Sequence, residues 1–478
     1  MPEEKSVEPR VLRGFRDYLP AQMNARLHLI SMIRAVYERY GFQPLDTPAL
    51  EHRLTLMGYG EENTKQIFEF LNPEEEQVAL RFDLTVPLAR VVAQYPDLPL
   101  PFRRYQVAPV WRADKPDPGR FREFTQFDID AVGVTTLAAD VEIISATHDV
   151  FRALGIERFR VRFSSRKVLD SLLDFSGIPR SSAYGVFRVM DKLDKIGLEG
   201  VVAELTSGRI DVSGDTIKGL GLATDRVDRI REFVAMPHGA RKDVLAALAD
   251  LFKAVPSAAE ALDDLGFICA ALDALGIADE RAALDLSIAR GLDYYTGSVF
   301  EAVLLDAPEF GSVFGGGRYD GLVERFLGKK IPGVGGSIGV DRLLAALQKL
   351  GLAGTGAATA QVLVTVMEPG RMVDYMMVTR EIREAGINAE LYMGTERGLR
   401  KQLQYADRLQ IPVGVILGSN EFSGGTVTVK NLRVGTQLQE KKGSAPGVER
   451  KDWLDRQRAV QNTVPRAGLV DEIRSMLG

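Results

Sequence analysis

Residues 101–133 contain two strand-like segments, and these limit the possible folds more than any other pattern in the chain. They are separated by KPDPG (115–119), whose prolines and glycine favour a turn or a long loop. Strands joined in this way run antiparallel and side by side. Because successive side chains of a strand point to opposite faces, Phe127, Ile129 and Ala131 are expected to face a core. The chain is therefore predicted to build a mainly antiparallel sheet around a long-looped hairpin.

The other face of the second strand is polar, and it carries Phe124, Gln126, Asp128 and Asp130. An aromatic ring, an amide and two carboxylates together suit a pocket that stacks a flat ring and binds a cationic or hydrogen-bond-donating ligand. A sheet face exposed to solvent is the simpler alternative, and this strand alone favours it. The neighbouring segments are needed to choose between the two interpretations.

Three arginines surround the loop of the hairpin. Arg112 ends the first strand, whereas Arg120 and Arg122 begin the second. Guanidinium groups pair bidentately with phosphate oxygens and keep their charge at neutral pH. A triphosphate is therefore the expected ligand, although arginine-rich loops also occur on ordinary protein surfaces.

Two further segments combine charged and hydroxyl side chains. In LRFDLTVPLAR, Asp83 precedes Thr85, which is expected to cap a helix, and capping alone would explain both residues. In IARGLDYYTG, Arg290, Tyr294 and Tyr295 lie between two apolar strands, where an unpaired charge is costly. Arg290 is therefore expected to have an anionic partner, either a substrate or a structural carboxylate.

The order of these patterns divides the 478 residues into domains. Residues 165–280 have helical periodicity and are expected to form a helical insertion, and the small residues 351–360 are typical of a linker. Residues 361–478 alternate strand and helix patterns, which predicts a C-terminal α/β domain. Residues 1–350 then form an α+β domain whose antiparallel sheet is flanked by helices.

Composition excludes several classes of function. Cys269 is the sole cysteine, so no disulfide framework and no cysteine zinc site are expected. The four histidines lack metal-ligand spacing, and no Gly-x-Ser-x-Gly segment offers an acyl-enzyme nucleophile. The sequence therefore predicts no protein metal site. Catalysis by positioning and electrostatics, as in nucleotidyl transfer, is favoured.

Hydropathy and charge bear on location and partners. Apolar runs are too short to span a bilayer, and the start MPEEKSVEPR lacks the apolar core of a signal peptide. We therefore expect a cytoplasmic protein without membrane association. The net charge is −5, yet residues 361–478 carry a small excess of Lys and Arg over Asp and Glu. That distribution permits a polyanionic partner at the C-terminal end.

Five segments carry a resemblance to a known family: GFQPLDTPALE, VWRADKPDPGRFREFTQFDIDAVG, RGLDYYTG, GGGRYDGL and GVGGSIGVDRLLAAL. The first, second and last resemble motifs 1, 2 and 3 of the class II aminoacyl-tRNA synthetases, and the other two resemble segments specific to the histidyl-tRNA synthetase family. The resemblance implies a class II catalytic domain in residues 1–350 and an anticodon-binding domain in residues 361–478.

The resemblance also implies a role for each matching residue. The residues that would bind histidine are Asp83, Thr85, Gln126, Asp130, Arg290, Tyr294 and Tyr295, with Asp130 and Tyr295 meeting the two imidazole nitrogens. The residues that would bind ATP are Arg112, Asp114, Arg120, Phe124 and Arg342. Arg112 and Arg290 would be catalytic, because they would face the charge that develops at the α-phosphate.

The implied partners are L-histidine, ATP, tRNA(His) and a second copy of the chain that pairs through motif 1. Mg²⁺ would be bound through phosphate oxygens, without a dedicated protein site. Contacts to tRNA are expected at Arg397, Arg400 and Lys401, although a solvated helix face explains these residues equally well.

Two other functions remain open at this stage. Synthetase-like relatives act as regulatory subunits of ATP phosphoribosyltransferase or as tRNA-sensing modules, but they typically lose the catalytic arginines, the RGLDYY stretch or the C-terminal domain, all of which this chain retains. The glycines of GVGGSIG resemble a dinucleotide-binding fingerprint, which favours an oxidoreductase. However, the acidic residue expected about 20 positions later is missing.

Overall fold

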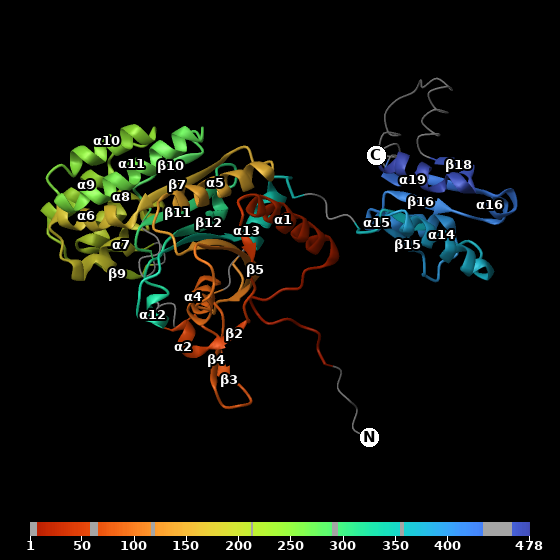
Figure 1. Ribbon diagram of the computed structural model, residues 1–478, viewed down its shortest axis with the longest axis horizontal. Helices are drawn as coiled ribbons and strands as arrows, with labels where there is room; N and C mark the ends of the chain where they lie inside the picture. The colour runs from red at the N-terminus through yellow and green to blue at the C-terminus, as the bar shows by residue number, and fades with distance from the viewer. Residues whose placement is uncertain are drawn as a thin grey trace. The chain divides into compact units, whose positions relative to one another are not determined.

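The computed structural model describes residues 7–57, 66–115, 120–211, 214–288, 295–353, 358–433 and 461–478, apart from the side chain of Asp194 (Figure 1). The chain forms two compact units. One comprises Met1–Asp17 and Arg26–Gly354, and the other Tyr18–Ala25 and Thr355–Gly478.

The first unit is built on an eight-stranded sheet. Its order is β1 (Gln43–Pro44), β5 (Phe102–Trp111), β6 (Glu123–Val132), β13 (Gly333–Gly339), β12 (Ser312–Arg318), β11 (Ser298–Leu304), β7 (Phe159–Ser165) and β10 (Ala282–Leu284). Neighbours from β5 to β7 pair antiparallel, whereas β1 and β10 join the two edges in parallel. The predicted antiparallel sheet, with the β5–β6 hairpin inside it, is confirmed.

The two glycine-dense segments form the adjacent strands β12 and β13. At Gly316 an added Cβ would collide with the backbone of Gly335, so these strands approach each other more closely than side chains would allow. β13 lies antiparallel between β6 and β12, rather than leading into a phosphate-binding turn of a parallel sheet. The dinucleotide-binding interpretation of GVGGSIG is therefore wrong.

Helices cover the sheet and bury its apolar face. α5 (Ala138–Ala153) packs across β6, β7, β12 and β13, and α13 (Val340–Lys349) packs against β6 and β13. From α1 (Pro20–Arg39), the Tyr37 ring meets the Phe127 ring at 5.2 Å. Phe127 and Ile129 are fully buried, as the alternation in the sequence predicted.

Between β7 and β10 the chain is largely helical, and these helices gather beyond that end of the sheet (Figure 1). They are α6 (Arg166–Ser176), α7 (Ala183–Met190), α8 (Leu193–Leu205), α9 (Thr224–Val234), α10 (Arg241–Leu251) and α11 (Ala259–Ala274). The segment also contains a short hairpin of β8 (Gly208–Ile210) and β9 (Thr216–Lys218), which the helical pattern did not predict. Strands of three residues are too short to show a period.

Within the described residues, the first unit also contains a small second sheet and three further helices. The sheet has the order β2 (Leu50–His52), β4 (Gln77–Leu80) and β3 (Glu69–Leu71). The helices are α2 (Arg53–Leu56), α4 (Thr85–Gln94) and α12 (Glu324–Leu327).

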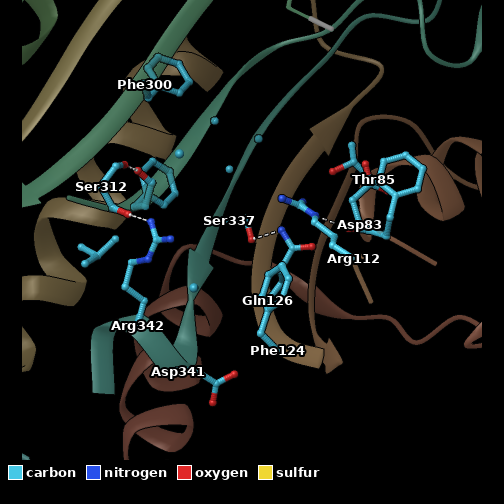
Figure 2. Close-up of a pocket in the computed structure, with 18 of the residues that line it drawn as sticks. Asp83, Thr85, Arg112, Phe124, Gln126, Phe300, Ser312, Ser337, Asp341 and Arg342 are labelled. Atoms are coloured by element: carbon cyan, nitrogen blue, oxygen red, sulfur yellow. Dashed lines mark hydrogen bonds between the residues drawn. The ribbon is translucent and has the colours of Figure 1, made fainter. Parts of the chain in front are cut away.

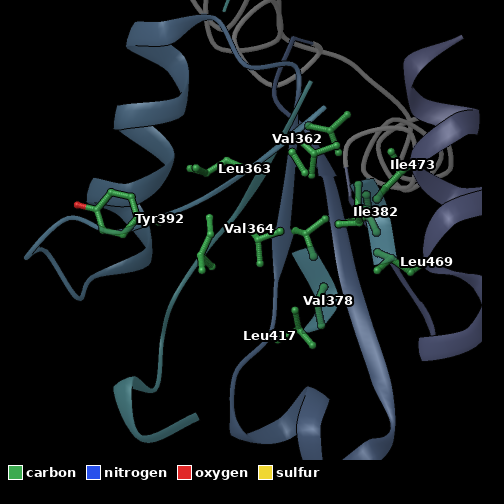
Figure 3. Packing of buried hydrophobic residues seen from close by; sticks show 14 of the residues in the cluster. Val362, Leu363, Val364, Val378, Ile382, Tyr392, Leu417, Leu469 and Ile473 are labelled. Atoms are coloured by element: carbon green, nitrogen blue, oxygen red, sulfur yellow. The ribbon is translucent and has the colours of Figure 1, made fainter. Parts of the chain in front are cut away.

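The second unit is an α/β domain with a five-stranded sheet. Its order is β15 (Ala389–Leu391), β14 (Val362–Val364), β16 (Val413–Ile416), β17 (Thr426–Asn431) and β18 (Gln461–Pro465). The helices described in this unit are α14 (Met372–Glu384), α15 (Leu399–Leu409), α16 (Ser419–Gly424) and α19 (Leu469–Leu477). β14 pairs in parallel with β15 and β16, and its side chains join Ile382 and Leu469 in an apolar core (Figure 3). The predicted C-terminal α/β alternation is confirmed.

None of the helices in the described part of the chain combines the length and apolar character needed to cross a membrane.

Candidate active site

A cavity of about 550 Å³ opens over the face of the sheet formed by β6, β12 and β13. The sequence-predicted residues that line it are Asp83, Thr85, Arg112, Asp114, Arg120, Phe124, Gln126, Asp130, Tyr295 and Arg342. Asp83 and Arg342 are 259 positions apart in the chain, and one cavity brings all of these residues together. Arg290 and Tyr294 lie outside the described residues.

The polar face of β6 forms the floor of the cavity. Phe124, Gln126 and Asp130 line it, and Asp128 and Asp130 are each only 1% exposed. The interpretation of this face as a solvated surface is therefore wrong. Gln126 donates from Nε2 to the Ser337 hydroxyl at 2.8 Å (Figure 2). Its Oε1 is buried without a partner among the described residues, so it is available to accept a hydrogen bond from a ligand.

Asp83 and Thr85 reach the cavity from the turn that leads into α4. The cap prediction was wrong, because Thr85 is the first residue of α4 and the Asp83 carboxylate accepts from the Val86 N–H at 3.1 Å instead. Thr85 is thereby left to line the cavity. Burial raises the pKa of Asp83 to about 6, although the Val86 N–H and the Arg112 charge oppose this shift.

Three guanidinium groups approach the cavity from different segments. Arg112 donates from Nε to the Phe82 carbonyl at 3.0 Å, and its guanidinium lies 5.2 Å from the centre of the Phe124 ring. Arg342 donates to the Ser312 carbonyl at 2.9 Å on the far side of β6 and β13 from Arg112 (Figure 2). Arg120 forms an ion pair with Asp114. Three guanidinium groups that reach one cavity from different segments, together with the Phe124 ring, suit a nucleotide with several phosphates.

Asp130 has two partners that the sequence did not predict. The Tyr319 hydroxyl donates to its Oδ1, and Nη2 of the buried Arg104 lies 2.9 Å from its Oδ2. Burial raises the pKa of Asp130 to about 7, Arg104 lowers it, and the nearby Asp128 raises it. Tyr319 belongs to the quoted segment GGGRYDGL, which was a usable signal. The role of Arg104 depends on the register of the hairpin, which places it opposite Asp130 and which the sequence alone does not reveal.

Asp341 also lines the cavity, but its carboxylate is engaged with the protein. It accepts from the Thr125 N–H at 2.7 Å and lies 3.4 Å from Arg26 and 3.5 Å from Arg16. These contacts fix the start of α13 against β6 and make Asp341 a poor metal ligand. In the described ranges, no group of three or more His, Cys, Asp and Glu side chains could hold a metal ion.

The residues predicted to contact tRNA lie in the second unit. Arg397, Arg400 and Lys401 are exposed at the start of α15, opposite its buried Gln402 and Ala406. Lys401 pairs with Glu396 at 2.8 Å. The three cations therefore project into solvent, as both an RNA-binding surface and a solvated helix would require.

Comparisons with known proteins agree with this architecture. The family model for histidyl-tRNA synthetase matches residues 14–343, and a model described as an anticodon binding domain matches residues 361–447. The chain is 42% identical to histidine–tRNA ligases of Paracoccus denitrificans, over 100% of this chain and 98% of that one, and of Caulobacter vibrioides, over 98% and 97%. It superposes on the crystal structure of histidyl-tRNA synthetase from Nostoc sp. PCC 7120 with a TM-score of 0.81, at 32% identity and over 98% and 100% of the two chains.

The antiparallel sheet, its flanking helices and the nucleotide-sized cavity define the catalytic domain of a class II aminoacyl-tRNA synthetase, followed by a C-terminal α/β domain. Within that class, the full-length matches are to histidine–tRNA ligases. The chain belongs to the histidyl-tRNA synthetase family.

Proposed function

We propose that this chain is a histidine–tRNA ligase, which activates L-histidine with ATP to histidyl-adenylate and then transfers the histidyl group to the 3′ end of tRNA(His). Full-length similarity to histidine–tRNA ligases supports the activity. The observation that carries the assignment of the site is the convergence of Arg112, Arg120 and Arg342 with the acidic pair Asp83 and Asp130 on one cavity.

The proposed substrate positions are those that the family resemblance implies, and the side chains of the cavity support them. The ammonium of histidine would be received by Asp83, Thr85 and Gln126, since a carboxylate and two uncharged oxygens suit three N–H donors. The imidazole nitrogens meet Asp130 and Tyr295. Matching both ring nitrogens rejects apolar side chains of similar size, which would leave buried polar groups unpaired.

ATP occupies the part of the cavity lined by Phe124 and lies within reach of the three arginines. Its adenine stacks on Phe124 with Asp114 near the exocyclic amine, and Arg120 and Arg342 hold the β- and γ-phosphates. In the first step the histidine carboxylate attacks the α-phosphorus in line and pyrophosphate leaves. Arg112, together with Arg290, neutralises the charge that develops on the α-phosphate oxygens. In the second step a terminal ribose hydroxyl of tRNA attacks the acyl carbon and AMP leaves.

The proposal includes a metal, a dimer and a compartment. Mg²⁺ would be held by the phosphate oxygens of ATP, since Asp341 is engaged with Thr125, Arg16 and Arg26, and it would supply additional charge neutralisation. Two copies would pair through the GFQPLDTPALE segment, whose strand β1 lies at an edge of the main sheet. The cytoplasm is the proposed compartment, where tRNA and ATP are available together.

Histidine-dependent exchange between ATP and labelled pyrophosphate tests the first step, and charging of tRNA(His) tests the second. An active chain performs both, whereas a regulatory subunit or an oxidoreductase performs neither. Sedimentation of the purified chain at twice its monomer mass tests the dimer.

Arg290→Ala tests the role assigned to Arg290. Loss of one preorganised donor to the transition state typically reduces the rate by roughly 10²–10³-fold. We expect a loss of that size in pyrophosphate exchange while the fold and the dimer are retained, as measured by circular dichroism and sedimentation. Exchange within tenfold of the unmodified chain would contradict the role.

A further inference from the structure

A fully buried arginine lies directly behind the proposed histidine-binding carboxylate. Arg104 of β5 is 0% exposed, and neither it nor Asp128 lines the cavity. In the hairpin register Arg104 faces Asp130, and Gln106 faces Asp128. A buried cation of this kind is costly unless it compensates other charges. The charge of Arg104 is compensated by the buried carboxylates of Asp128 and Asp130.

The contacts of Arg104 connect three parts of the site. Its Nη2 lies 2.9 Å from Asp130 Oδ2 and 3.7 Å from Asp128 Oδ2, and it also donates to the Leu84 carbonyl at 3.1 Å. Leu84 lies between Asp83 and Thr85 in the chain, so the same guanidinium holds the turn proposed to receive the ammonium. One cation thus fixes two acids of β6 and the turn before α4.

Several other groups act on this pair of acids. Asp130 is influenced by Tyr319 beyond β12 and by Asp83 before α4, and it pairs with Gly335 of β13. Asp128 is influenced by Ser337 of β13, by Arg112 after β5 and by Arg81, and Tyr37 of α1 faces both acids. Tyr37 and Tyr319 stay protonated, because burial and the neighbouring carboxylates raise their pKa values well above the usual range. Arg104 forms ion pairs with both Asp128 and Asp130, and it lowers the pKa of each more than any other cation does, while Arg112 and Arg81 add smaller effects on Asp128.

We propose that Arg104 is a positioning residue that keeps Asp130 ionised and oriented as an acceptor, and that its balance against Asp128 sets the pH range in which the cavity accepts histidine. This inference rests on the proposed function, since it assigns Asp130 to the imidazole. An ionised Asp130 accepts a hydrogen bond from the imidazole N–H, whereas a protonated Asp130 has lost that acceptor and gained a donor. Removing Arg104 leaves two buried carboxylates side by side, so one of them takes a proton.

Substitutions of the cation and of the second acid should have opposite effects on the pH profile. The variants are Arg104→Met, Asp128→Asn and the combination of the two, with Arg104→Lys as the conservative replacement. Arg103→Met is the matched control, because Arg103 is the preceding residue of β5, is partly exposed and pairs with Glu142 at 2.8 Å. The measurement is histidine-dependent pyrophosphate exchange from pH 5.5 to 9, with the KM of histidine and of ATP determined separately and thermal unfolding as the check on folding.

We expect Arg104→Met to raise the KM of histidine at pH 7 at least tenfold. In the pH profile of kcat/KM, the midpoint of the acidic limb should move to higher pH by about one unit or more. The KM of ATP should stay within twofold. Asp128→Asn moves the midpoint to lower pH, and adding it to Arg104→Met recovers part of the lost affinity. Arg104→Lys lies between Arg104→Met and the unmodified chain, and Arg103→Met changes neither KM.

Three results would overturn the inference: a midpoint that moves in neither variant, a combined variant that recovers nothing, or KM values for histidine and ATP that rise together. If Arg104→Met does not fold, the acid shift of Asp128→Asn decides the question by itself. Absence of exchange in the unmodified chain would instead contradict the proposed function, so the two failures are distinguishable.

Discussion

At the scale of the residue, the site depends on carboxylates that are kept away from water. Asp83 and Asp130 are nearly fully buried, and burial raises their pKa values to about 6 and about 7. A desolvated carboxylate gains more from an ammonium or imidazole partner than a solvated one does, because its charge is poorly screened. The chain therefore retains acids that lower its stability and that would strengthen substrate binding.

Asp83→Asn separates these two effects. The pKa of Asp83 is raised from 3.8 to about 6 in the folded chain, so above pH 6 folding buries a carboxylate that the unfolded chain would solvate. The substitution should therefore increase the free energy of unfolding at pH 8, by at most ~3 kcal/mol, but not at pH 4. Asparagine can still accept from the Val86 N–H and so retains the helix cap. Thermal unfolding at the two pH values is the measurement.

The same variant should lose histidine affinity. Loss of a charge-assisted hydrogen bond to the ammonium is expected to raise the KM of histidine about 10–100-fold at pH 8. In the unmodified chain that KM should rise as the pH falls through 6, and the variant should lack this component. Asp97→Asn, at an exposed acid, is the control. A stabilised variant with normal histidine affinity would contradict the assignment of Asp83.

At the scale of the element, β13 shows why glycine is required in a buried strand. Gly335 pairs with Asp130 across the sheet, and an added Cβ would overlap the Asp130 carboxylate. At Gly336 the added atom would overlap the ring of Phe314, another residue of the cavity wall. The absence of side chains at Gly335 and Gly336 therefore provides the space in which the Asp130 carboxylate and the Phe314 ring lie against β13.

Gly335→Ala should disturb the acid pocket without abolishing the fold. Overpacking of this kind typically costs about 1–3 kcal/mol. Relief requires rotation of Asp130 away from Arg104 and Tyr319 and also a shift of the β6 backbone, because the added Cβ would lie 2.5 Å from the Ile129 carbonyl oxygen. We expect a lower melting temperature and a higher KM for histidine in pyrophosphate exchange. Gly339→Ala in the same strand is the stability control, because its added Cβ would meet Arg342 Cβ at an ordinary 3.7 Å. Equal melting temperatures for the two variants would contradict this account of β13.

At the scale of the whole molecule, the chain divides its chemistry between two units. The cavity belongs entirely to the first unit, whereas the exposed cations of α15 belong to the second. Each unit has its own sheet and apolar core. Substitutions on the surface of the second unit are therefore expected to affect the tRNA step and to leave amino-acid activation unchanged.

Replacing Arg400 and Lys401 together with alanine tests this division. If these cations contact tRNA phosphates, the KM of tRNA should rise several-fold and should depend less steeply on salt, because fewer counterions are released on binding. Pyrophosphate exchange should stay within twofold of the unmodified chain. Arg380→Ala, at an exposed residue of α14 paired with Glu384, is the control. An unchanged KM for tRNA would favour a solvated helix face.

Local sequence patterns predicted the hairpin, the alternating faces of β6 and the α/β order after residue 361, because strand and helix periods are local properties of the chain. The packing of distant segments buries the polar face of β6, pairs Arg104 with Asp130, and lets the Asp83 carboxylate, instead of Thr85, accept from the Val86 N–H. These outcomes depend on which strands become neighbours and in which register. Burial and charge pairing arise from contacts between segments that are far apart in the chain, so a local stretch of sequence cannot predict them.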